Sequence, residues 1–142
     1  MGLYRSDPAA PGANVGRRRA ATRAARRARL DGAVARFNAS EAARTVAGLS
    51  RSLGRPAVSV GAAAGSPNEV RITVAWELCW YQWGVDLAGE RPVVQIARGA
   101  EVEELDRSAR QWNAAAARGG RLTIGAPAAT RPGRSARWLA RR

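Results

Sequence analysis

The 142-residue sequence contains no histidine and no lysine, and its single cysteine is Cys79. Without histidine the chain lacks the commonest general base, and Ser–His pairs, Cys–His pairs and most zinc sites are excluded. One cysteine cannot form an internal disulfide, which fits a reducing compartment. The glycines form no phosphate-binding loop motif, which would also require lysine. We therefore expect a protein that is not an enzyme and that binds no cofactor or metal.

Long apolar runs are also missing from the sequence. No stretch of about eighteen apolar residues is present, so we expect no membrane span and a cytoplasmic protein. The C-terminal "RSARWLARR", residues 134–142, sets a tryptophan and a leucine among arginines. A short segment of this kind has only marginal affinity for an anionic membrane surface, and that function is a minor alternative.

Arginine supplies all the positive charge, with 24 residues and a net charge of +13. Its codons are GC-rich, like those of alanine, glycine and proline, so a GC-rich genome accounts for part of this excess. Residues 1–37 contain nine arginines and two acids, residues 126–142 five arginines and no acid, and residues 38–125 ten arginines and nine acids. Blocks of like charge favour solvated ends. We expect an arginine-rich arm over 1–37, disordered or partly helical, a single domain over 38–125, and a disordered basic tail over 126–142.

The arginine-rich ends make nucleic acid a candidate partner. Arginines attract the phosphate backbone without regard to base sequence. The candidate phosphate contacts are Arg17, Arg18, Arg19, Arg23, Arg26, Arg27, Arg134, Arg137, Arg141 and Arg142.

Two helical patterns are expected near the start of the domain. Leu30, Val34 and Phe37 share one face, so the last two turns of the arm are expected to dock although Gly32 interrupts them. Asn38 is the expected N-cap of the next helix, with Glu41 completing a capping box. Its apolar stripe and its C-terminal stop are formed by Ala42, Val46, Leu49, Leu53 and Gly54.

The middle of the domain alternates with the period of a β-strand. A short strand is expected over 57–60, followed by a loop, and a long strand over 70–80. The apolar phase changes after Trp80, which predicts a bulge near Gly84. On the expected strand, Trp76 and Trp80 share one face and belong to the core.

The second half of the domain is expected to contain a strand over 93–97, a helix over 100–120 and a strand over 121–125. In the expected helix, the apolar residues recur at spacings of three and four, and the acids of "EVEELD" lie in the first turn. The sequence thus predicts an α+β domain in the order α-β-β-β-α-β, with a small antiparallel sheet and helices on one face.

The aromatic cluster "WELCWYQW", residues 76–83, supplies the candidate interaction surface: Glu77, Tyr81 and Trp83. These residues are not accounted for by the core-facing side of the strand. A pocket or active site that uses Glu77 and Tyr81 is a third alternative, since burial would raise the pKa of a carboxyl group.

The stretches "ITVAWELCWYQWGVDL" and "ELDRSARQWNA" resemble small uncharacterised proteins of high-GC actinobacteria. The resemblance covers residues 40–123, implies a bacterial source, and carries no activity, ligand or functional residue to this chain. Our first hypothesis is a non-enzymatic module that binds an unknown protein partner or self-associates. The alternative is a nucleic-acid-associated protein whose arginine-rich arms bind phosphate.

Overall fold

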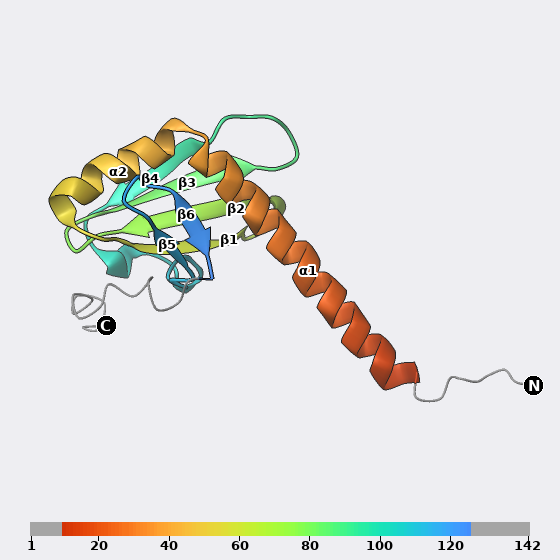
Figure 1. Ribbon diagram of the computed structural model, residues 1–142. Helices are drawn as coiled ribbons and strands as arrows, with labels where there is room; N and C mark the ends of the chain where they lie inside the picture. Colours follow the sequence, from red (N-terminus) through yellow and green to blue (C-terminus); the bar gives the residue numbers. More distant parts are fainter. Residues whose placement is uncertain (1–9, 126–142) are drawn as a thin grey trace, which may run out of the picture.

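The computed structural model describes residues 10–125, which form an α+β fold with two helices on one face of a six-stranded antiparallel sheet (Figure 1). The strand order is β4-β3-β2-β1-β5-β6. The elements are α1 (Ala10–Asn38), α2 (Glu41–Leu53), β1 (Ala57–Ala63), β2 (Ser66–Ala75), β3 (Trp80–Asp86), β4 (Val94–Gly99), the 3-10 turns η1 (Val102–Glu104) and η2 (Arg107–Ala109), β5 (Ala114–Ala116) and β6 (Leu122–Ile124). The predicted tail over 126–142, with Arg134, Arg137, Arg141 and Arg142, lies outside the described residues.

From Ala10 onward, the arginine-rich arm is a continuous helix, α1, which projects away from the sheet in Figure 1. Gly32 does not interrupt it. Leu30, Val34 and Phe37 are buried in the main core, which confirms the expected docking of the last two turns. Residues 14–29, in contrast, are exposed. The packed part of the chain therefore begins near Leu30 rather than at Asn38.

Helix α2 has the predicted apolar stripe but a different N-cap. Ser40 caps it, and the Ser40 hydroxyl accepts a hydrogen bond from the Ala42 N–H at 3.1 Å. Asn38 instead ends α1, so the predicted Asn38 cap is wrong: the chain needs two residues to turn between the helices. Gly54 ends α2 with φ 90°, as predicted, and its N–H donates to Ser50 O.

The predicted strand over 70–80 is the β2–β3 hairpin. β2 ends at Ala75, the turn over 76–79 is closed by a 2.7 Å hydrogen bond from Trp76 N–H to Cys79 O, and β3 returns beside β2. The two tryptophans consequently lie on opposite faces of the sheet: Trp76 in the main core, Trp80 in a second cluster. Leu78, which shares the apolar face of Trp76 and Trp80 in the predicted strand, is 70% exposed in the turn. The prediction failed because alternation continues unbroken through a turn that contains no glycine, proline or asparagine.

The strands differ from prediction in two further places. β1 extends to Ala63 and β2 begins at Ser66, so most of the expected loop between them is sheet. The irregularity predicted at Gly84 is a register shift between Gln82 and Trp83 in the pairing of β3 with β4.

No helix forms over residues 100–120. The segment contains η1 and η2 and then enters β5, and Trp112 has a left-handed φ of 46° that a helix cannot accommodate. Val102 and Leu105 cover Trp80 and Ala75 on the outer face of the sheet. Burial of these apolar groups against the sheet overrides the helix propensity of the segment. The observed order is thus α-α-β-β-β-β-β-β rather than the predicted α-β-β-β-α-β.

Candidate functional site

The free half of α1 carries the first candidate site. Six candidate phosphate contacts, Arg17, Arg18, Arg19, Arg23, Arg26 and Arg27, are all exposed along it. Arg27 pairs with Asp31 at 3.0 Å, and Arg17 donates to Asn14 Oδ1 at 3.0 Å. Arg18, Arg19, Arg23 and Arg26 have no hydrogen bond or ion pair to any described residue. Arg29, which the sequence analysis did not select, is also exposed on this helix.

The arginines are not evenly distributed around α1. Arg19, Arg23 and Arg26 follow one another at spacings of four and three, and the same face continues four residues later at Leu30, and then at Phe37. We call Arg19, Arg23 and Arg26 the inner arginine face, because it continues the face that packs on the sheet. Arg17, Arg18 and Arg29 lie about 80° or more away from its centre.

The arginines of α1 repel one another. Arg19 and Arg23 stand four residues apart, as do Arg23 and Arg27, and such like-charged pairs each cost a helix about 0.2–0.5 kcal/mol. No acid lies in the first turn to compensate the positive end of the helix dipole. A bound polyanion would remove the repulsion between these arginines.

α1 leaves the folded domain beside the end of β6. A Cβ atom added at Gly125 would lie 3.8 Å from Arg27 Nη2, so the last described residue is next to the basic helix. The tail that follows Gly125 in the sequence is therefore attached at the base of the exposed part of α1. Gly125 and Arg27 are thus neighbours in space although about a hundred residues separate them in sequence.

The structure separates the candidate surface formed by Glu77, Tyr81 and Trp83. Trp83 is 3% exposed and contacts Phe37 edge-on, with the ring centroids 5.2 Å apart. Tyr81 is half-buried and stacks on Trp83 at 5.9 Å. Glu77 is exposed in the hairpin turn. These three residues therefore present a core indole, a half-covered phenol and a solvated carboxylate rather than one surface.

The acids after β4 hold Trp80 of the second cluster in place by hydrogen bonds. Glu104 Oε1 accepts hydrogen bonds from Trp80 Nε1 and from Glu101 N–H, each at 3.1 Å. Trp80 Nε1 also donates to Glu101 O at 2.9 Å. In the described part of the chain, no three His, Cys, Asp or Glu side chains group closely enough to hold a metal ion.

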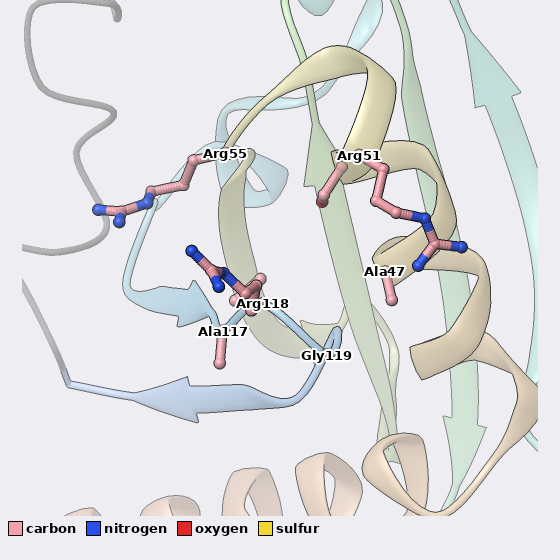
Figure 2. Close-up of a pocket in the computed structure, with 8 residues that line it drawn as sticks. Ala47, Arg51, Arg55, Ala117, Arg118 and Gly119 are labelled. Carbon is pink, nitrogen blue, oxygen red and sulfur yellow. The ribbon is translucent and has the colours of Figure 1, made fainter.

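A second basic site lies between α2 and the β5–β6 turn (Figure 2). The cavity has a volume of about 600 Å³, and three arginines line it: Arg51, Arg55 and Arg118. In Figure 2, Arg55 and Arg118 extend on the same side of the cavity, whereas Arg51 turns away from them. Ser50 also lines it. Sequence analysis missed this site because Arg118 lies more than sixty residues from Arg55 along the chain.

Among residues 10–125 no helix combines the length and apolar character needed to cross a membrane. Comparisons of the chain with protein-family models, with curated proteins and with solved structures give no match.

Proposed function

We propose that the protein binds the phosphate backbone of nucleic acid, independently of base sequence, through the inner arginine face of α1. The supporting observation is that Arg19, Arg23 and Arg26 are exposed, lack an acidic partner among the described residues, and share one face of a helix that projects from the domain. This function is the alternative that the sequence suggested, a nucleic-acid-associated protein whose arginine-rich arms bind phosphate. The candidate interaction surface of the first hypothesis loses support because Trp83, one of its three residues, is buried.

The dimensions of the helix suit this partner. Arg19 and Arg26 are separated by about 10 Å along the helix axis, a length over which duplex DNA presents several phosphates. An α-helix with its side chains is about as wide as the major groove. Arginine binds phosphate with two parallel hydrogen bonds, which alanine neighbours do not obstruct.

The salt dependence of binding tests the proposal. The full-length chain would be titrated against a labelled duplex at several salt concentrations by fluorescence anisotropy. The slope of log K against log salt is negative, and removing one arginine that binds a phosphate lowers its magnitude by about 0.9. The variant Arg19→Gln/Arg23→Gln/Arg26→Gln should therefore lower it by about 2.7. Glutamine preserves helix propensity, so the change removes charge without disrupting α1.

The matched control is Arg17→Gln/Arg18→Gln/Arg29→Gln, which removes the same charge from the other faces of α1. This control should lower the magnitude of the slope by less than about 1. Equal effects of both triple variants would disprove the role of the inner arginine face. Absence of duplex binding by the unaltered chain at low salt would disprove the function itself.

Self-association is a second candidate function, and the edge strand β4 favours it. Val94 and Ile96 on this strand are 50% and 42% exposed, and β4 pairs with β3 alone in the described sheet. An exposed strand edge with apolar side chains is a template for pairing with another chain. Light scattering after size exclusion should show a dimer that Ile96→Lys converts to monomer; a monomeric unaltered chain at about 100 μM would exclude this function.

A further inference from the structure

We propose that the cavity between α2 and the β5–β6 turn binds the phosphate group of a small phosphorylated molecule. This site is separate from the inner arginine face and does not depend on the nucleic-acid function. A cavity of about 600 Å³ has the size of ordinary small-molecule pockets, and it exceeds what a bare phosphate fills.

The charge of the cavity is uncompensated. Arg51, Arg55 and Arg118 make no ion pair or hydrogen bond within the described chain, and no acidic side chain of that part lines the cavity. Elsewhere in the domain, Arg44, Arg71 and Arg91 each pair with a carboxylate. The unpaired guanidinium groups are free to bind an anion, and their geometry matches that of phosphate.

Arg51 has a separate structural explanation. It lies in the last turn of α2, where a positive charge interacts favourably with the helix dipole, and it folds back along that helix toward Gly48. Arg118 lies on the β5–β6 turn, so the dipole does not explain its position. The phosphate is therefore assigned to Arg55 and Arg118, which extend on the same side of the cavity (Figure 2).

Ser50 supplies a second, independent observation. Its hydroxyl oxygen is buried and has no hydrogen-bond partner among the described residues, although Ser50 lines the cavity. A buried hydroxyl without a partner is costly. Rotation of the Ser50 side chain toward the cavity would let its hydroxyl hydrogen-bond a phosphate oxygen. Ala47, Ala116 and Ala117 form an apolar lining that suits the organic part of the ligand.

The walls of the cavity are held rigidly. Gly120, with φ 84°, packs directly against the carbonyl of Ala43, which fixes the β5–β6 turn to α2. Arg118 is two residues from this contact. The backbone of the β5–β6 turn, which carries Arg118, is therefore held against α2 before a ligand arrives, and this reduces the loss of entropy on binding.

Amide chemical shifts of the full-length chain, recorded during titration with AMP at constant ionic strength, test this proposal. We expect saturable shifts at Ser50, Arg118 and Gly119. Arg55→Gln/Arg118→Gln should raise the dissociation constant about tenfold or more, because two charge-assisted hydrogen-bond donors are lost. The control Arg29→Gln/Arg107→Gln removes the same charge from exposed positions outside the cavity and should leave the constant unchanged.

Three results would overturn the proposal: shifts confined to α1, the same dissociation constant in both double variants, or equal binding of AMP and adenosine. Ser50→Ala should weaken AMP binding severalfold while the melting temperature stays constant or rises, since the hydroxyl has no partner within residues 10–125. A lower melting temperature with unchanged affinity would refute the role of Ser50. Duplex binding by Arg55→Gln/Arg118→Gln should remain normal, so failure here and failure of the proposed function are distinguishable.

Discussion

The side chain of Asn38 forms both hydrogen bonds that a neighbouring strand would offer to Leu122. Asn38 Nδ2 donates to Leu122 O at 3.1 Å, and Asn38 Oδ1 accepts from Leu122 N–H at 2.8 Å. Asn113 binds Val60 in the same way, at 2.9 and 2.8 Å. The Asn38 amide pairs with the outer edge of β6 at the end of α1. The Asn113 amide extends the pairing of β1 with β5. These amides complete a sheet whose last two strands have three residues each.

Replacement of Asn38 by alanine should lower the free energy of unfolding by about 2–3 kcal/mol, because both backbone groups of the buried Leu122 lose their partner. Asn38→Asp keeps the acceptor and loses the donor, so its free energy of unfolding should lie between those of the unaltered chain and Asn38→Ala. Urea unfolding followed by tryptophan fluorescence measures both. Asn14→Ala, an exposed change in the free half of α1, is the control, and a loss of equal size there would contradict the role of Asn38.

The Gly119–Gly120 pair provides a matched test of the β5–β6 turn. At Gly120, φ is 84° and an added Cβ would collide with the Ala43 carbonyl, whereas at Gly119 nothing lies within 4 Å. Gly120→Ala should therefore lower the free energy of unfolding by at least about 2 kcal/mol. Gly119→Ala should change it by about 0.5 kcal/mol or less. Similar effects of the two substitutions, measured by denaturant titration, would show that the turn is not locked to α2.

Circular dichroism should detect the like-charge repulsion along α1. Salt screens the repulsion and a polyanion neutralises it, so the ellipticity at 222 nm should become more negative when duplex DNA is added at low salt. The change should be smaller in Arg19→Gln/Arg23→Gln/Arg26→Gln, since that helix repels itself less. A DNA-independent spectrum would argue against binding through α1.

Cys79 should react slowly in the folded protein. Burial raises the pKa of the Cys79 thiol, so a smaller fraction is thiolate at pH 8 than in the unfolded chain, and the thiolate is the reactive form. Iodoacetamide alkylation at pH 8 should be slower in the folded chain than in urea. Because the unfolded thiol ionises first, this difference should narrow as the pH rises above the folded pKa. Equal rates at pH 8 would contradict the effect of burial.

Local patterns could be predicted from the sequence where one element packs on one surface. The α2 stripe and the docking of Leu30, Val34 and Phe37 follow from helical periodicity alone. The β2–β3 hairpin could not be predicted, because Glu77 and Leu78 continue the alternation through the turn. The helix expected over 100–120 was wrong because Val102 and Leu105 are buried against Trp80, a contact that depends on the hairpin. Exposure of the arginines in α1 could be foreseen, whereas Arg55 and Arg118 meet only through the tertiary structure.

The packed residues of α1 fix the direction in which its exposed arginines point. The segment from Arg26 to Leu30 connects the basic and apolar parts of one face without a break in the helix. One alanine inserted there would rotate every arginine before it by about 100° about the helix axis and leave the charge and the packed residues unchanged. Four inserted residues would restore the direction to within about 40° and displace the arginines by about 6 Å. The direction in which the arginines point is therefore set by the number of residues between them and Leu30.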